Sequence, residues 1–260
     1  MITFYDFLCP PPQVTKSGNT WKTRLTLNYK GLPYKTENIE YAEIADLYKK
    51  HGIPPAIVFP NGHAHYTLPV IKDDSSGKDV FVVDSLEIAK YLDKTYPNTP
   101  RLIPDVEDAE AQIKAFENQM NGTFVSVMPV MFKASLSSIT ERSQEFFKAA
   151  RVRDMNFIFP HKPVSSWDDI QFTPEEVQAA WASLEKPLDA LSNRFGGKET
   201  FHWALGDQIT SADLILAGLL LCVKAVNGED SPQWQSIMTW SNGKWKTFLD
   251  KLEPYQSQEN

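Results

Sequence analysis

Residues 17–24 combine small hydroxyl and amide side chains with the start of a helical pattern. Ser17 and Asn19 follow a strand-like run at 2–6 and a proline-containing loop, and they precede apolar residues spaced four apart, Trp21, Leu25 and Tyr29. The unpaired N–H groups and the dipole at such a helix start favour an anion. Because Ser, Thr and Asn are also the ordinary N-cap residues, the stretch is either a plain cap or an anion site.

Two later pairs of residues could also form part of a binding site. Leu68-Pro69 begins an apolar strand, and it is either a trans proline at a sheet edge or a cis peptide that turns the backbone of Leu68 outward. Asp84-Ser85 fits the start of a capping box with Glu87. This pair either only caps a helix, or Ser85 binds a carboxylate while Asp84 holds an ammonium group.

Composition excludes several classes of function. The 260 residues are 42% hydrophobic with a net charge of −7 and no long basic run, so we expect no nucleic-acid partner and no membrane-surface partner. Cys9 and Cys222 are too few for a disulfide framework or a structural zinc site. The N-terminus lacks a signal-peptide pattern and the longest apolar run is about half a membrane span, so we expect a cytoplasmic protein.

His63 and His65 are the one pair with metal-ligand potential. No third ligand lies near them in the sequence, so we expect exposed loop residues and no metal site.

The first hundred residues alternate between strand and helix patterns. Strands are predicted at 2–6, 34–41, 68–72 and 80–83, and helices at 20–30, 44–50 and 85–95. This order predicts a mixed sheet with helices on its faces, in a domain at 1–96. Residues 97–105 contain several prolines and are the predicted linker.

From residue 106 onward the patterns are helical. Pro129 should break a long segment at 106–135, and further helices are predicted at 141–156, from Thr173-Pro174 to about residue 195, and at 233–252. The helix that starts at Thr210-Ser211-Ala212-Asp213 is apolar on nearly every side, which is typical of the middle of a bundle. We therefore predict an α/β domain followed by an all-α helical domain at 106–255.

Four motifs in this order resemble the glutathione transferase superfamily. They are the S-x-x-x-W-[RK]-x-R-[LI] helix start at 17–25, the Leu68-Pro69 pair, the Asp84-Ser85 pair and the [ST]-x-x-D box at 210–213. The amino-acid sequence of residues 19–34 further resembles that of the fungal class related to bacterial lignin β-etherases.

The resemblance implies a thioredoxin-like N-terminal domain that binds glutathione as co-substrate, an all-helical C-terminal domain that carries the second-substrate pocket, and a homodimer. A hydroxyl donor from Ser17, with Asn19 as a second donor, would favour the thiolate of glutathione, whose free thiol ionises near pH ~8.5. Ser17, Asn19 and Thr20 all stay open as the residue that faces the sulfur.

The remaining glutathione contacts follow from the same resemblance. Leu68 and Pro69 would bind the cysteinyl part, and Asp84 and Ser85 would hold the γ-glutamyl ammonium and carboxylate. The thiolate then attacks an electrophilic carbon, or a benzylic carbon beside an aryl ether in the etherase version.

An apolar stripe supplies candidates for the second substrate. Its members recur near helical spacing on both sides of Pro129: Phe116, Met120, Phe124, Met128, Met131 and Phe132. Core packing accounts for most such stripes. The resemblance implies that some of them line a pocket for hydrophobic aromatic molecules, and we expect Phe124, Met128, Met131 and Phe132 to do so.

Two rival functions stay open from the residues. Cys9-Pro10 suggests a thioltransferase that forms a mixed disulfide, although prolines separate Cys9 from the helix, so we expect a loop residue. A non-catalytic ligandin that binds aromatic metabolites is the second rival. The natural electrophile is not predicted.

Overall fold

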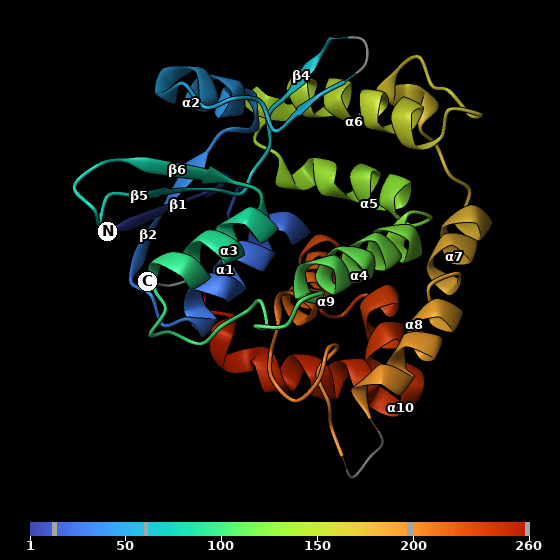
Figure 1. Cartoon of the computed structure of the whole chain (residues 1–260). Helices are drawn as coiled ribbons and strands as arrows, with labels where there is room; N and C mark the ends of the chain where they lie inside the picture. Colours follow the sequence, from blue (N-terminus) through green and yellow to red (C-terminus); the bar gives the residue numbers. More distant parts are fainter. Residues whose placement is uncertain (12–14, 60–61, 197–199, 258–260) are drawn as a thin grey trace.

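Four strands near the N-terminus form one mixed sheet (Figure 1). The computed structural model describes residues 1–11, 15–59, 62–196 and 200–257. The strands are β1 (Ile2–Phe7), β2 (Tyr34–Ile39), β5 (Val70–Asp73) and β6 (Val80–Val83), in the order β2-β1-β5-β6. β1 is parallel to β2 and antiparallel to β5, and β5 and β6 form an antiparallel hairpin. The predicted mixed sheet is confirmed.

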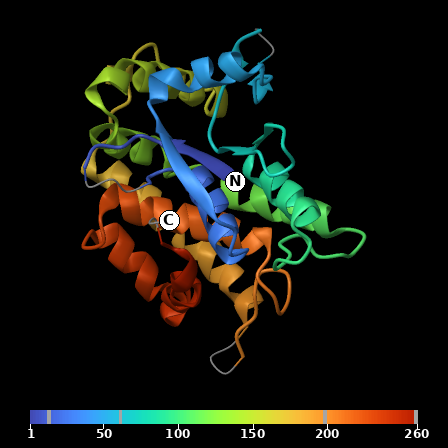
Figure 2. The same ribbon diagram turned by 90° about the vertical axis from the view of Figure 1, so that its left-hand side faces the viewer.

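The two faces of the sheet bury different side chains of β1. Ile2 and Phe4 pack on one face with residues of α1 (Gly18–Tyr29) and α3 (Ser85–Thr95). Tyr5, which points the other way, packs with residues of α2 (Ile44–His51). In Figure 2, α2 lies above the blue strands, and the orange and red helices of the second part of the chain lie below them.

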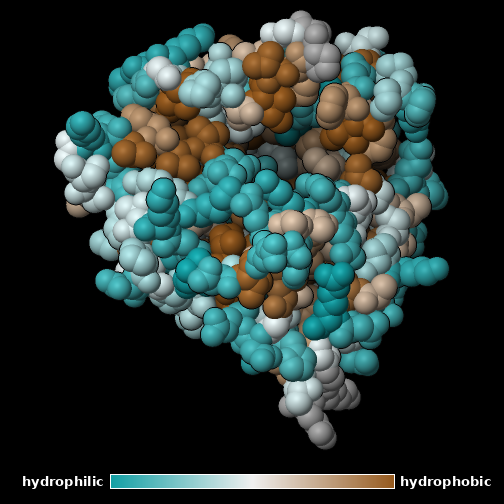
Figure 3. Space-filling model, viewed as in Figure 1, coloured by the Kyte–Doolittle hydropathy of each residue, from teal (hydrophilic) through white to brown (hydrophobic). Residues whose placement is uncertain are grey.

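A second, two-stranded sheet was not predicted from the sequence. β3 (Ile57–Val58) and β4 (Ala64–His65) pair antiparallel, and the Phe59 ring lies 5.4 Å from that of Phe157. Ile57, Val58 and Phe157 are exposed, and brown side chains surround a hollow on this part of the surface (Figure 3).

The histidine prediction is half wrong. His63 is exposed, but His65 lies in β4 and is half-buried, and burial lowers its pKa. The described residues hold no group of three or more His, Cys, Asp or Glu side chains arranged to bind a metal ion.

The second part of the chain is helical. Its helices are α4 (Ala109–Phe124), α5 (Met128–Ser135), α6 (Gln144–Ile158), α7 (Pro174–Ala182), α8 (Glu185–Ser192), α9 (Ser211–Asn227) and α10 (Pro232–Leu252). Short 3₁₀ turns occur at Tyr41–Glu43, Leu136–Ser138, Glu141–Ser143, Trp167–Asp169, Asn193–Phe195 and Glu253–Tyr255. Pro129 lies in the first turn of α5, so the predicted break is confirmed.

Two helix predictions need correction. The segment after Thr173 is two helices, α7 and α8, rather than one, and Pro187 lies inside the first turn of α8, where a missing N–H costs little. α10 is interrupted, because Ser241, Asn242 and Gly243 have positive φ angles.

α9 is the central helix, as predicted. Of its 17 residues, 11 are buried, and it packs against α1, α4, α5 and α10. Its capping box is formed by Thr210 and Asp213, and the Asp213 carboxylate also accepts the N–H of Ala204 at 2.7 Å. The helix N-terminus and the preceding loop are therefore fixed by one buried carboxylate.

The segment between α3 and α4 is tied down at a buried ion pair. The Lys30 ammonium lies 2.6 Å from the Asp93 carboxylate, which also accepts the N–H groups of Leu102 and Ile103. The Leu102 carbonyl accepts the N–H of Ser211 at the start of α9. In the described part of the chain, every helix is too short or too polar to cross a membrane.

Candidate active site

A cavity lies where the start of α1 meets helices of the second half of the chain. It offers about 260 Å³ to water-sized molecules. Its lining comes from the loop after β1, the first turn of α1, Tyr41, and helices α4, α5, α6 and α9. Apolar side chains make most of this lining, with Lys16, Ser17, Asn19, Asn121 and Arg151 among its polar members.

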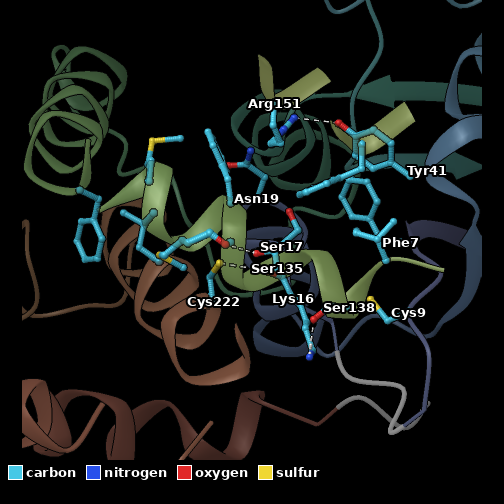
Figure 4. Close-up of a pocket in the computed structure, with 18 of the residues that line it drawn as sticks. Phe7, Cys9, Lys16, Ser17, Asn19, Tyr41, Ser135, Ser138, Arg151 and Cys222 are labelled. Atoms are coloured by element: carbon cyan, nitrogen blue, oxygen red, sulfur yellow. Dashed lines mark hydrogen bonds between the residues drawn. The ribbon is translucent and has the colours of Figure 1, made fainter. Parts of the chain in front are cut away.

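Ser17 is the N-cap residue of α1 and lines the cavity. Its backbone is extended (φ −96°, ψ 123°), and its hydroxyl oxygen accepts the N–H of Thr20 at a long 3.5 Å. Among the described residues no acceptor is paired with the hydroxyl proton of Ser17, so this proton can be donated to a ligand. Ser17 and Asn19 lie centrally among the lining residues drawn in Figure 4.

The structure separates the three candidates for the sulfur contact. Thr20 is fully buried, and its hydroxyl donates to the Ser17 carbonyl at 3.2 Å. Thr20 does not belong to the lining, whereas Ser17 is half-buried and Asn19 is exposed within it. Of the three candidates, Ser17 and Asn19 can therefore contact a ligand in the cavity, and Thr20 cannot.

The remaining residues of the 17–24 motif hold the turn in place. The indole N–H of Trp21 donates to the Thr15 carbonyl at 3.0 Å. The Arg24 guanidinium lies 3.0 Å from the Asp6 carboxylate, which also accepts the hydroxyl of Thr15. The loop that leads to Ser17 is therefore anchored to both α1 and β1.

α9 supports the same turn from the other side. The Cys222 thiol donates to the Lys16 carbonyl at 3.1 Å. Gly18 and Gly218 touch backbone to backbone, since a Cβ added at Gly218 would lie 2.5 Å from the Gly18 carbonyl oxygen. The absence of side chains at both positions allows α1 and α9 to approach this closely.

The predicted contacts for the rest of glutathione lie outside the lining of this cavity. The Leu68-Pro69 peptide is cis, and Asp84, at φ 78°, caps α3 by accepting the N–H groups of Leu86 and Glu87. Ser85 is the first residue of α3 and is buried.

The register of the strands nevertheless brings these pairs to the same end of the sheet as the C-terminus of β1, from which the loop to Ser17 starts. Val70 pairs with Tyr5 near the end of β1 and with Val83 at the end of β6. Pro69 directly precedes Val70, and Asp84 directly follows Val83. The end of β1, the cis peptide and the α3 cap thus share one edge.

The four candidates for the second-substrate pocket all line the cavity. Phe124 comes from α4, and Met128, Met131 and Phe132 come from α5. Phe116 and Met120 of the same stripe are buried in the core instead.

Sequence reasoning missed three lining residues at one end of the cavity. Tyr41 follows β2, and Phe147 and Arg151 come from α6. The four-residue spacing of Phe147 and Arg151 places them on one helix face, which was the available signal. No local pattern distinguished Tyr41.

Cys9 lines the cavity but is poorly suited to nucleophilic chemistry. It lies in the loop after β1, as predicted, and only 4% of it is exposed. Burial, assisted by the nearby Asp6 carboxylate, raises the pKa of the Cys9 thiol to about 11. The thiol is therefore protonated at neutral pH.

Comparison with known protein families gives two matches that together span most of the chain. The model for the N-terminal domain of glutathione S-transferase matches residues 13–100, and the model for the C-terminal domain matches residues 111–255. The chain is also 31% identical over 257 residues to a glutathione S-transferase-like protein of Aspergillus flavus, which covers 95% of this chain and 88% of that protein.

Solved structures of fungal proteins are similar over the whole chain. A glutathione S-transferase of Ceriporiopsis subvermispora, solved in complex with glutathione, has a TM-score of 0.86 and 36% identity over 100% of this chain and 99% of that one. The glutathione transferase GSTFuA3 of Phanerochaete chrysosporium has a TM-score of 0.86 and 33% identity over 100% of this chain and 98% of that one.

Proposed function

Because the chain belongs to the glutathione S-transferase family, as its four motifs predicted, we propose that its cavity joins the sulfur of glutathione to a hydrophobic aromatic electrophile. The observation that carries this proposal is the position of Ser17. Its unused hydroxyl proton lies at the head of α1, inside a cavity that Phe124, Met128 and Phe132 also line.

Glutathione binding is supported by the relatives and by the topology. The similar protein of Ceriporiopsis subvermispora was solved with glutathione. In this chain the glutathione cysteine would reach Ser17, its backbone would pair with Leu68 beside Pro69, and its γ-glutamyl end would extend to Asp84 and Ser85. The position of these residues at one end of the sheet supports this path.

The chemistry assigned to Ser17 is stabilisation of the thiolate. A hydroxyl donor and the positive end of the α1 dipole both favour the charged form, and each pKa unit of lowering corresponds to about 1.4 kcal/mol. Asn19, two residues after Ser17 in the first turn of α1, supplies a second donor. The thiolate attacks the electrophilic carbon, the C–S bond forms, and the leaving group departs with its electron pair.

Two refinements belong to the proposal. In the etherase version the bond that breaks is the C–O bond of a β-aryl ether, and the aryloxide that leaves takes a proton from water. The corresponding physiological task is detoxification of lignin-derived aromatic compounds. A mixed disulfide on Cys9 is disfavoured, because the raised pKa of its thiol keeps it protonated.

The proposal is tested by Ser17→Ala with Ser135→Ala as the matched control. Ser135 lines the same cavity, but its hydroxyl donates to the Met131 carbonyl within α5. We expect Ser17→Ala to raise the pKa of bound glutathione by about one unit or more and to lower kcat/KM near pH 6.5 about tenfold. The readouts are thiolate absorbance and conjugation of a chloronitrobenzene across pH.

Equal effects of the two substitutions would contradict the role of Ser17. Tight binding of an aromatic dye by the unmodified protein, with no conjugation of any electrophile, would support the ligandin function instead.

A further inference from the structure

One end of the cavity is polar and is built around Arg151. Its guanidinium Nη2 donates to the Tyr41 hydroxyl at 2.9 Å (Figure 4) and lies 2.8 Å from the Asp154 carboxylate. Aromatic rings enclose the same guanidinium, whose central carbon lies 4.7 Å from the ring centroid of Phe132 and 5.1 Å from that of Phe147. These contacts fix the orientation of Arg151.

Two hydrogen-bond donors at this end are unused. The Tyr41 hydroxyl accepts from Arg151, and within the described ranges its own proton is paired with no acceptor. The Arg151 Nε is buried, and none of the described residues accepts its hydrogen. Burial raises the pKa of Tyr41, so this hydroxyl is a donor at neutral pH.

The local charge favours an anionic acceptor. Asp154 compensates for one positive charge, but Arg151 and Arg153 both lie close enough to act on Tyr41. The balance of these three side chains is one net positive charge. A buried unpaired donor is costly, and a carboxylate is the group that accepts from two donors at once.

We propose that Tyr41 and Arg151 bind a carboxylate carried by the second substrate, so that the preferred electrophiles are aromatic acids. This inference rests on the proposed function and names its substrate class. Phe132 and Phe147 would contact the aromatic ring, while the carboxylate accepts from the Tyr41 hydroxyl and pairs with the positive charge of the Arg151 guanidinium, since both residues line the cavity.

The test compares 4-chloro-3-nitrobenzoate with its methyl ester as substrates for glutathione conjugation. In both, the C–S bond forms and chloride leaves with the electron pair of the C–Cl bond, so only the carboxylate differs. The ratio of kcat/KM for the acid to that for the ester is measured in the unmodified protein and in Arg151→Met, Tyr41→Phe and Arg153→Met. Arg153 is an exposed arginine outside the cavity lining and is the matched control.

We expect Arg151→Met to lower the acid-to-ester ratio about tenfold or more and Tyr41→Phe to lower it by a smaller factor, as for lost hydrogen bonds to a charged group. Arg153→Met removes the same charge from outside the cavity lining and should lower the ratio by less than either of these substitutions. Because Tyr41→Phe removes only one oxygen atom, it keeps the test available if Arg151→Met does not fold.

Three outcomes separate this inference from its premise. If neither compound is conjugated by the unmodified protein, the proposed function itself fails. If both are conjugated and neither substitution changes the ratio, the carboxylate site is refuted. If Arg151→Met weakens glutathione binding in calorimetry and leaves the ratio unchanged, the carboxylate bound there is that of glutathione, which also overturns the inference.

Discussion

At the scale of single residues, the 17–24 motif contains residues that line the cavity and residues that hold the turn in position. Ser17 and Asn19 face the cavity, whereas Trp21 and Arg24 hold the loop and the first strand against α1. The chemistry of the turn thus depends on residues that touch no ligand in the cavity. Cys9 is the opposite case. A cysteine could act as a nucleophile, but burial raises the pKa of this thiol and keeps it protonated.

The raised pKa of Cys9 predicts slow alkylation at neutral pH. In a Cys222→Ser variant, which keeps a donor to the Lys16 carbonyl, iodoacetamide should label folded Cys9 about 100-fold more slowly at pH 7.5 than the same thiol in urea. The rate should rise about tenfold per pH unit up to its pKa of about 11. Mass spectrometry measures the labelling rate. Rapid labelling at pH 7.5 would support the thioltransferase function instead.

The sequence predicted site residues well where they are close in the chain or follow a helical period. Six residues found in this way line the cavity: Ser17, Asn19, Phe124, Met128, Met131 and Phe132. Tyr41 and Arg151 were not found, because their meeting is a contact across 110 residues. No period or local motif encodes a contact of that kind.

At the scale of secondary-structure elements, the contact between α1 and α9 positions the turn. The two helices meet through Gly18 and Gly218, and no side chain separates their backbones. The 17–24 motif lies at the start of α1, but its position therefore depends equally on the surface of α9.

Gly218→Ala should reduce both activity and stability. The added Cβ would lie 2.5 Å from the Gly18 carbonyl oxygen, so the first turn of α1 must move. We expect a destabilisation of about 1–3 kcal/mol in urea unfolding, as for other overpacked cores, together with a lower kcat for conjugation.

Gly122→Ala in α4 is the control, since nothing lies within 4 Å of its added Cβ. This substitution should stabilise slightly, because alanine favours a helix. Equal stability and activity of the two variants would show that α1 tolerates displacement.

Element prediction failed where the structure depends on tertiary contacts. The strands of the β3–β4 hairpin have two residues each, too short for a visible alternation, and Phe59 in that segment packs on α6. The interruption of α10 falls at Ser241-Asn242-Gly243, residue types that tolerate positive φ but also occur inside helices. The central α9 was predicted correctly because its all-round hydrophobicity is local information.

At the scale of the whole molecule, one buried ion pair holds the segment that connects the two halves of the chain. Lys30 ends α1, Asp93 lies in α3, and the Asp93 carboxylate holds the backbone of Leu102 and Ile103. The hydrogen bond from Ser211 to Leu102 extends this connection to α9. The homodimer implied by the family resemblance stays a prediction.

Asp93→Asn should be strongly destabilising, since it leaves the Lys30 ammonium buried without a counter-charge. Broken buried pairs typically cost about 3–5 kcal/mol, measured here as the free energy of unfolding in urea. Adding Lys30→Met to this variant should recover part of the loss.

Asp46→Asn is the control, because the Asp46–Lys49 pair is exposed and should contribute no measurable stability. If Asp93→Asn unfolds at the same urea concentration as Asp46→Asn, the buried ion pair does not stabilise the fold.

The contacts of Gly218 and Cys222 with the turn cannot form until α9 has been synthesised. Ser17 precedes Gly218 by 201 residues (218 − 17), and chains grow at about 5–20 residues per second, so the turn leaves the ribosome roughly 10–40 s before its support. During that interval the nascent chain carries every residue of the 17–24 motif without a completed site. Under the proposed function, the ability to activate glutathione is then acquired late in translation, when α9 emerges and docks.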